Sequence, residues 1–233
     1  MFNFIGVIVS FIYFFGLLFI APIFKKNLEI SRKFVHIMLG NWWFIVILFF
    51  NNVWAASIVP FSFIFINYLS IKRNKAGGLL SELERKNESK SYGIITYPIA
   101  MLLLVIISFT LLRTPYIGGI GLMALSYGDG FAALVGKKFD YIKFTTWGNK
   151  KTISGCVGMF IATFISITIF ISIASIYHSI SVIIILSLIL ALVATFFEAF
   201  TPVGFDNITV PLSVVGAYYF ILNICLSSYI IIK

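Results

Sequence analysis

The sequence predicts an all-α integral membrane protein with about eight transmembrane helices. Hydrophobic residues make up 61% of the 233 residues, charged residues only 11%, and the mean hydropathy is +1.06. These values exclude an ordinary soluble domain. Apolar stretches close to the roughly 20 residues that a spanning helix needs recur along the chain. Lys and Arg gather between alternate stretches, as expected for loops on one side of a membrane.

The expected spans follow one another with short polar connections. The fifth contains Asp129 and several glycines and is the weakest, so seven spans are the alternative count. We expect the first span to be retained, because it has no basic start and no small-residue cleavage site of a signal peptide. The eight spans are Phe2–Phe24, Phe34–Phe50, Val53–Ile71, Gly93–Leu112, Ile117–Val135, Ile153–Tyr177, Ser181–Phe197 and Pro211–Ile232.

The distribution of basic residues supports eight spans with the N-terminus outside. Cytoplasmic loops are enriched in Lys and Arg. With this count, three inner connections hold 15 of the 17 basic residues, and adding or dropping a span before Gly136 would scatter them over both sides. Because the net charge of +9 is divided among membrane loops, nucleic acid is not an expected partner. The inner connections are Lys25–Lys33, Lys72–Tyr92, Gly136–Thr152 and Glu198–Val210.

The whole chain, residues 1–233, is expected to form one polytopic domain without internal repeats. The polar segment Lys72–Ser91 is too short for a domain and forms either an amphiphilic helix on the inner membrane surface or a solvated loop. Cys156 and Cys225 are isolated and lack the spacing of a zinc or redox site. The abundance of Ile, Phe, Asn and Lys hints at an AT-rich genome and a prokaryotic cell membrane.

Asp129 lies within an apolar stretch, Ser126-Tyr-Gly-Asp-Gly-Phe-Ala-Ala-Leu-Val-Gly136. A carboxylate at the centre of a membrane helix costs about 2.5–3.5 kcal/mol on insertion scales, so one kept there usually has a function. Gly128 and Gly130 flank it, and we expect them to let a ligand approach the backbone closely. Mg²⁺ takes carboxylate ligands, which makes Asp129 a candidate metal ligand. The alternative is an aspartate that caps a helix or pairs with a lysine.

Two further acids, Glu198 and Asp206, lie between the last two expected spans. Pro202 and Gly204 separate them, a pattern typical of a broken helical corner that lines a polar cavity. Glu198 and Asp206 are candidate metal ligands or groups that orient an attacking hydroxyl. Asn207 is expected to hydrogen-bond a phosphate or a base. The alternative is that Asp206 and Asn207 cap the final helix.

The segment Asn149-Lys-Lys-Thr-Ile-Ser-Gly-Cys-Val-Gly158 opens a hydrophobic helix with two lysines and two hydroxyl residues. The N-terminus of a helix presents unpaired N–H groups and partial positive charge, which favours phosphate. Paired lysines before a span are also a topology signal, an alternative that is strongest for Lys150. The candidate phosphate-binding residues are Lys151, Thr152, Ser154 and Gly155.

A fourth motif, Ser31-Arg-Lys-Phe-Val-His36, begins the second span. Arg32 and His36 are one helical turn apart and therefore share a face. Arg32 suits phosphate, and His36 suits a general base or a hydrogen-bonding partner. A structural histidine at the entrance of a span is the alternative.

Together these motifs resemble the phytol kinase and dolichol kinase family, membrane enzymes that use CTP to phosphorylate long isoprenoid alcohols. The resemblance runs in the same order from Ser31 to Pro211. Gly128-Asp-Gly-Phe-Ala132, followed by Gly-Lys-Lys-Phe with Lys137, is similar to the phytol kinase pattern. Glu198-Ala-Phe-Thr201, followed by Asp-Asn and a proline, is similar to the dolichol kinase pattern.

The resemblance implies a CTP and Mg²⁺ site at the cytoplasmic face. Ala133 stands where phytol kinases often carry a second acid, so a second metal ligand must come from elsewhere in the chain; Cys156 stands where many members have Ser. The implied metal ligands are Asp129, Glu198 and Asp206. The implied nucleotide-site residues are Arg32, Gly128, Gly130, Lys137, Lys151, Thr152, Ser154, Gly155 and Asn207.

The expected reaction is transfer of a phosphoryl group from CTP to a lipid alcohol such as phytol, geranylgeraniol, farnesol or a polyprenol. Asp129 would hold Mg²⁺ on the phosphates, Lys151 would grip them, and Glu198, Asp206 or His36 would act on the hydroxyl. The alternatives are a CTP-dependent diacylglycerol kinase, a CDP-lipid cytidylyltransferase, whose Gly-His-Gly-Gly run is missing here, and an ion-coupled transporter. The particular alcohol and the oligomeric state stay open.

Overall fold

The computed structural model describes residues 1–24, 27–72, 92–147, 149–176, 179–202 and 204–231. The described chain is helical apart from one short hairpin, which confirms the all-α prediction. The elements are α1 (Phe2–Ile20), η1 (Ala21–Phe24), α2 (Leu28–Gly40), α3 (Trp42–Phe49), α4 (Val53–Lys72), α5 (Tyr92–Ile106), η3 (Ile107–Leu111), α6 (Pro115–Met123), η4 (Ala124–Asp129), α7 (Gly130–Phe139), β1 (Lys143–Thr146), β2 (Asn149–Thr152), α8 (Ile153–Ile173), α9 (Ile180–Phe200) and α10 (Asp206–Ile231).

Seven helical segments of the described chain are long and apolar enough to cross a membrane, and they coincide with the first seven expected spans. The eighth expected span, Pro211–Ile232, corresponds to α10 (Asp206–Ile231) except for Ile232, which lies outside the described residues. At 1.5 Å per residue the 26 residues of α10 extend about 39 Å, more than the roughly 30 Å of a hydrocarbon core. The seven segments are Phe2–Phe24, Glu29–Phe49, Val53–Ser70, Gly93–Leu111, Pro115–Phe139, Ile153–Ile173 and Ile180–Phe200.

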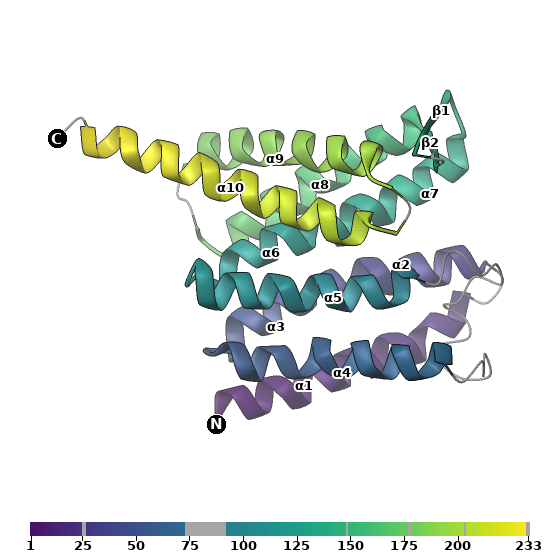
Figure 1. Cartoon of the computed structure of the whole chain (residues 1–233), viewed down its shortest axis with the longest axis horizontal. Coiled ribbons are helices and arrows are strands. Elements are labelled where there is room, and N and C mark those ends of the chain that lie inside the picture. Colours follow the sequence, from purple (N-terminus) through teal and green to yellow (C-terminus); the bar gives the residue numbers. More distant parts are fainter. Residues whose placement is uncertain (25–26, 73–91, 148, 177–178, 203, 232–233) are drawn as a thin grey trace.

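The helices run side by side, and the chain reverses direction between successive spans (Figure 1). The links from α1 to α2, from α7 to α8 and from α9 to α10 lie at one end of the molecule, while the N-terminus lies at the other. The connections between spans therefore alternate between the two ends of the molecule, as the distribution of basic residues predicted. The expected surface helix or loop at Lys72–Ser91 lies outside the described residues.

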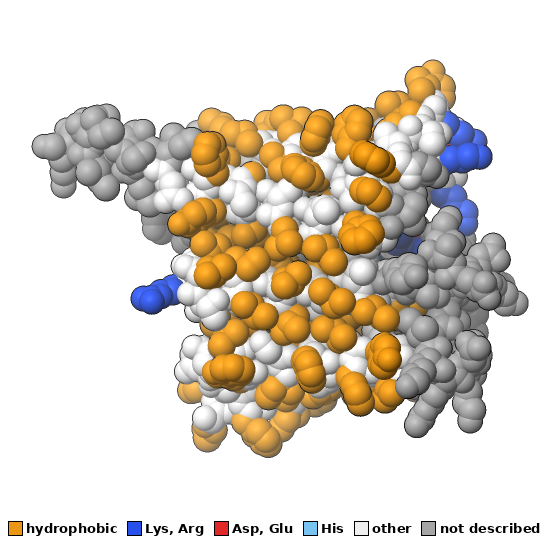
Figure 2. Space-filling view, in the orientation of Figure 1, with side chains coloured by type: hydrophobic (Ala, Val, Ile, Leu, Met, Phe, Trp, Pro, Cys, Tyr) orange, Lys and Arg blue, Asp and Glu red, His pale blue; other side chains and the backbone are white. Residues whose placement is uncertain are grey.

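Hydrophobic side chains cover most of the visible face, whereas Lys and Arg gather at the end that carries the β-hairpin (Figure 2). Apolar sides with charge confined to the ends are the pattern of helices surrounded by lipid. The outward face of α4 shows this at single residues, since Trp54 and Phe61 are 82% and 63% exposed.

The fifth span, the weakest in the sequence, is the central helix of the bundle. In Pro115–Phe139, 72% of the apolar window is buried within the protein, against 28–39% for the other six segments. The glycines of this segment explain why it is the weakest span in the sequence and also why it is the most buried in the bundle. A Cβ on Gly119 would lie 2.6 Å from the Trp43 ring and closer still to Phe170, so only glycine lets these aromatic rings pack against α6. Small residues at such contacts are typical of membrane helices.

The second span is divided at Asn41 into α2 and α3. Tyr127 donates a hydrogen bond to the Asn41 side-chain oxygen at 2.9 Å, which ties the break to η4. The next two residues are fully buried tryptophans with satisfied indole groups: Trp42 donates to the Ser10 hydroxyl at 2.9 Å and Trp43 to the Pro115 carbonyl at 2.6 Å. These bonds fix the short helix α3 between α1 and α6.

We predict that Gly119→Val destabilises the protein by about 1–3 kcal/mol, because overpacking a filled core forces side chains out of their preferred rotamers. The matched control is Gly216→Val on α10, where an added Cβ meets no atom within 4 Å. The measurement is the midpoint temperature of unfolding of each variant in detergent, monitored as loss of the monodisperse species. The difference between the two midpoints gives the effect of Gly119→Val. Equal midpoints for the two variants would contradict the packing role of Gly119.

Candidate active site

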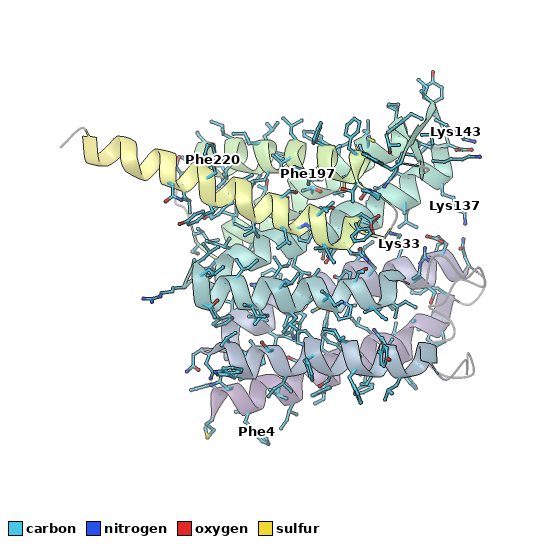
Figure 3. All side chains as sticks on the ribbon, viewed as in Figure 1. Phe4, Lys33, Lys137, Lys143, Phe197 and Phe220 are labelled. Carbon is cyan, nitrogen blue, oxygen red and sulfur yellow. The ribbon has the colours of Figure 1, made fainter. Side chains whose placement is uncertain are left out.

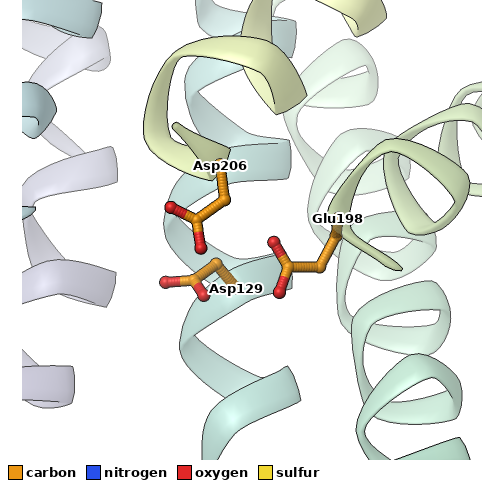
Figure 4. A group of neighbouring side chains, drawn as sticks. All are labelled: Asp129, Glu198 and Asp206. Carbon is orange, nitrogen blue, oxygen red and sulfur yellow. The ribbon is translucent and has the colours of Figure 1, made fainter. Parts of the chain in front are cut away.

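Three carboxylates converge at the end of the bundle that carries the hairpin. Asp129 ends η4, Glu198 lies in the last turn of α9, and Asp206 begins α10. Each offers a ligand oxygen, and these oxygens all lie within 4.8 Å of one another. Figure 4 shows the three side chains pointing toward one point from three separate elements. The structure therefore brings together the three acids that the sequence proposed as metal ligands.

The local structure explains how the acids reach this point. Residues Ala124–Asp129 form a π-helical segment, a wider turn that is frequent at functional sites and that shifts the direction of the following side chains. Between Glu198 and Asp206 the chain reverses, with Gly204 at a φ of 83° that favours glycine. Asp206 then accepts a hydrogen bond from the Asn207 backbone N–H at 3.0 Å, which fixes its carboxylate at the start of α10.

Asp129 is held by two side chains of α2. Lys33 Nζ lies 2.7 Å from Asp129 Oδ2, and His36 Nε2 lies 3.1 Å from the same oxygen. His36 Nε2 also lies 3.2 Å from the Leu125 carbonyl oxygen. Because both neighbours of Nε2 are acceptors, this nitrogen carries the hydrogen and donates to Asp129. The geometry makes His36 a group that orients the carboxylate.

Glu198 is buried, at 6% exposure, and pairs with Lys151 of strand β2 through its Oε1 atom. Burial alone would lower the pKa of Lys151, but the attraction of Glu198 more than offsets it, so the pKa of Lys151 lies above its ordinary value. Lys151 therefore stays charged at neutral pH. Glu198 Oε2 has no hydrogen-bond partner among the described residues.

The connection Gly136–Thr152, expected as a basic loop, contains a two-stranded antiparallel hairpin. Lys143 is paired with Thr152 and Thr146 with Asn149. The Thr146 hydroxyl donates to the Ala199 carbonyl at 2.7 Å, next to Glu198. The hairpin thus places Lys151 beside the acids and delivers the chain directly to the N-terminus of α8.

Thr152, a candidate phosphate-binding residue, caps α8. Its hydroxyl oxygen accepts a hydrogen bond from the Gly155 backbone N–H at 3.0 Å, and Ser154 donates to the same oxygen at 3.2 Å. A Cβ on Gly155 would lie 3.1 Å from the Ala132 carbonyl, and one on Gly136 would lie 3.3 Å from Gly155 Cα. These two glycines hold the first turn of α8 tightly against α7.

Gly128 and Gly130 have packing contacts that differ from the expected approach of a ligand. A Cβ on Gly128 would lie 2.6 Å from Met159 Sδ, and one on Gly130 would lie 2.8 Å from Ile37 Cδ1. The first contact joins η4 to α8 and the second joins α7 to α2. Both glycines serve helix packing on either side of Asp129, and neither is among the residues that line the cavity.

The other expected site residues lie around the acids. Asn207 is 7% exposed, and its amide nitrogen donates to Thr96 at 2.9 Å and to the Gly93 carbonyl at 3.3 Å, so it ties α10 to α5. Arg32 pairs with Glu29 at 2.5 Å. Lys137 lies in the last turn of α7 and, with Lys143, at the hairpin end of the molecule (Figure 3).

A cavity of about 900 Å³ connects these groups. One part is polar and includes the three acids, Arg32, His36 and five lysines of α2, α7 and the hairpin. The other part is apolar and lies among residues of α1, α2, α4 and α5. A single cavity therefore offers cationic groups at an end of the bundle and a hydrophobic lining further inside.

The donor set fits a hard divalent cation such as Mg²⁺. Two oxygens on one Mg²⁺ lie at most about 4.2 Å apart, since each Mg–O distance is about 2.1 Å. The 4.8 Å spread of the cluster comes within about 1 Å of that limit. Three carboxylates face the two ammonium groups of Lys33 and Lys151, which leaves one negative charge uncompensated, and Glu198 Oε2 has a free acceptor position.

Lys33 is a site residue that the sequence prediction missed. Its side chain is buried against Asp129, at 7% exposure for the residue. Lysine next to a span looks like an ordinary topology signal, which concealed its role. The available signal was its spacing of three residues from His36, because residues three apart share a helical face. Tyr97 was missed as well; its ring packs edge-on against His36 with centroids 4.6 Å apart.

The fold and the site define a membrane protein with a carboxylate cluster and a cationic cavity at one end of its helices. Curated proteins similar to this chain include "Phytol kinase" of Synechocystis sp., 29% identical over 189 residues that cover 79% of this chain and 76% of that protein. "Probable phytol kinase, chloroplastic" of Triticum aestivum is 30% identical over 198 residues, covering 79% and 65%. No family model and no solved structure matches the chain. These similarities support the assignment of the chain to a phytol kinase-type family, which its motifs predicted.

We predict that Mg²⁺ or Mn²⁺ raises the unfolding temperature of the protein. In Asp206→Asn the same rise should need a metal concentration at least about tenfold higher, the range seen when groups supporting a metal site are removed. Asparagine can still accept the Asn207 N–H, so the fold of the corner is kept. The control is Asp140→Asn, whose exposed carboxylate pairs with Lys143 at 2.7 Å. The same metal response in all three proteins would exclude the cluster as the binding site.

Proposed function

We propose that the protein is a CTP-dependent kinase that phosphorylates the hydroxyl of a long-chain isoprenoid alcohol at the cytoplasmic face of the membrane. The observation that carries the proposal is the single cavity that joins three carboxylates and several lysines to an apolar interior. Such a cavity suits a reaction between a polyanion from water and an alcohol from the bilayer. The names of the similar proteins support the choice of a prenol-type acceptor. One polytopic domain would carry the whole reaction.

The polar part of the cavity is the proposed nucleotide site. Lys137, Lys143 and Lys150 line it together with Lys151, so four ammonium groups surround the space where a triphosphate would enter. The capped N-terminus of α8 adds the partial positive charge of a 21-residue helix. Lys151, kept charged by Glu198, is the proposed contact to the transferred phosphoryl group.

The acids have overlapping proposed roles, and Asp206 has two. A divalent metal bound by Asp129, Glu198 and Asp206 would neutralise charge on the phosphates. Lys33 and His36 orient Asp129, since both contact the same carboxylate oxygen. Asp206 is the proposed base, because its neighbour Asn207 contacts α5 at the entrance of the apolar part of the cavity.

The proposed transfer forms one bond and breaks one. The hydroxyl oxygen of the lipid attacks the γ-phosphorus of CTP, and the bond from that phosphorus to the oxygen bridging it to the β-phosphorus breaks. The hydroxyl proton passes to Asp206. The products are the lipid monophosphate and CDP, and binding of the lipid tail within the membrane keeps the attacking oxygen in position.

The sidedness of the site rests on the positive-inside rule. Eight basic residues of the described chain lie in or next to the connections at the site end, whereas Arg113 lies in the turn between η3 and α6 at the opposite end. This bias favours a cytoplasmic site and hence the cytoplasmic nucleotide pool.

The test is a transfer assay with the purified protein in detergent, Mg²⁺ and a panel of prenols, diacylglycerol and phosphatidate. CTP labelled on the γ-phosphate is compared with CTP labelled on the α-phosphate and with γ-labelled ATP. Only the γ label of CTP should reach a prenol, and a chelator should stop the transfer. Transfer of the α label would identify a CDP-lipid synthase, and labelling of diacylglycerol alone would identify a diacylglycerol kinase. Binding of no nucleotide would favour an ion-coupled transporter.

We predict that Asp129→Asn lowers kcat at least about 10²-fold, the usual effect of removing one group that stabilises transition-state charge. The variant should fold, because the asparagine oxygen still accepts from Lys33 and His36. Size-exclusion profiles and the initial rate of γ-phosphoryl transfer check both statements. Retained turnover in this variant would remove Asp129 from the reaction.

A further inference from the structure

The apolar part of the cavity is a defined arm rather than an open hydrophobic surface. It passes between four helices that lie next to each other, α1, α2, α4 and α5. The end near the acids is at Gly93, whose carbonyl accepts from Asn207. Met101 lies eight residues further along α5, which is about 12 Å deeper at 1.5 Å per residue. The lining residues that matter here are Phe14, Leu18, Leu39, Phe63, Pro98 and Met101.

The deep end of the arm is closed by aromatic side chains. The rings of Phe14 and Phe63 lie 4.6 Å apart, and both residues are nearly buried, at 4% and 7% exposure. Trp42 packs edge-on behind Phe14 with centroids 6.0 Å apart and is itself held by its bond to Ser10. The Phe14 and Phe63 rings form the floor of the arm, and contacts on the side away from the cavity hold this floor in place. A lipid tail that enters from the end with the acids would therefore meet a rigid stop.

Asn67 stands on the wall of the cavity one helical turn from Phe63, on the same face of α4. Its amide nitrogen donates to the Ile94 carbonyl at 2.8 Å, an acceptor that fixes which atom is nitrogen. Its Oδ1 is buried and has no hydrogen-bond partner among the described residues. Asn67 therefore ties α4 to α5 at the wall of the cavity.

We propose that this arm is the tail subsite for a single-chain lipid alcohol, with Phe14 and Phe63 as its floor. Diacylglycerol is disfavoured because it brings two tails to one arm. The inference rests on the proposed function, since it assumes that the lipid alcohol enters the cavity that holds the acids.

The test measures binding and transfer separately. Binding is the rise in unfolding temperature caused by farnesol, geranylgeraniol, phytol or dioleoylglycerol, and transfer is kcat/KM with γ-labelled CTP. Leu39→Phe adds an aromatic ring to the arm without removing a contact, so it should fold and should weaken prenol binding about tenfold or more. Stabilisation by CTP with Mg²⁺ should be unchanged, because Leu39 lies outside the polar part of the cavity.

Phe63→Ala deepens the arm and should raise the preference for geranylgeraniol over farnesol about tenfold, within the range that hydrophobic pockets give for small changes of size. The matched control is Phe61→Ala on the same helix, whose side chain is 63% exposed on the outer face.

The outcomes separate the two proposals. If the wild type transfers phosphate to prenols and both Leu39→Phe and Phe63→Ala behave like Phe61→Ala, the tail subsite is wrong while the kinase function stands. If the wild type transfers no phosphate but prenols still stabilise it, and Leu39→Phe removes that stabilisation, the tail subsite stands and the proposed reaction fails.

Discussion

Compensation of buried negative charge is the constraint on which this structure depends. Three carboxylates within 4.8 Å repel one another, and at the ends of membrane helices water screens that repulsion only in part. Lys33 and Lys151 supply the opposing charge from two different elements, α2 and β2. The pairs therefore join α2 to η4 and the hairpin to α9. The contacts that gather the three carboxylates therefore also hold together, at one end of the bundle, helices that are far apart in the sequence.

Packing on either side of the cluster gives these charges a rigid support. Gly128 and Gly130 bring α8 and α2 close to the central span, and Gly155 brings α8 onto α7. The π-helical turn at η4 then aims Asp129 into the space between them. A site built on helices that are held in this way needs little rearrangement to accept a ligand, which is the condition for precise binding.

Much of this arrangement was predictable, because acids in apolar sequence are rare and have few explanations. Asp129, Glu198 and Asp206 could be grouped on that ground, and the span count followed from hydropathy and charge. The hairpin could not be predicted, since two four-residue strands rich in Lys and Thr carry no apolar alternation. Lys33 was hidden for a different reason, because a lysine that neutralises a buried acid and one that orients a helix look identical in sequence.

The closed floor of the apolar arm has a consequence for the membrane itself. Because Phe14 and Phe63 block the arm partway through the bundle, the cavity gives no passage from one side of the bilayer to the other. If the arm holds the lipid tail as proposed, the lipid enters from the leaflet at the site end, and its product, now carrying a charged head, returns to that leaflet. Any acceptor in the opposite leaflet has to cross the bilayer first, so transbilayer movement of the lipid sets how much of the pool the protein can use.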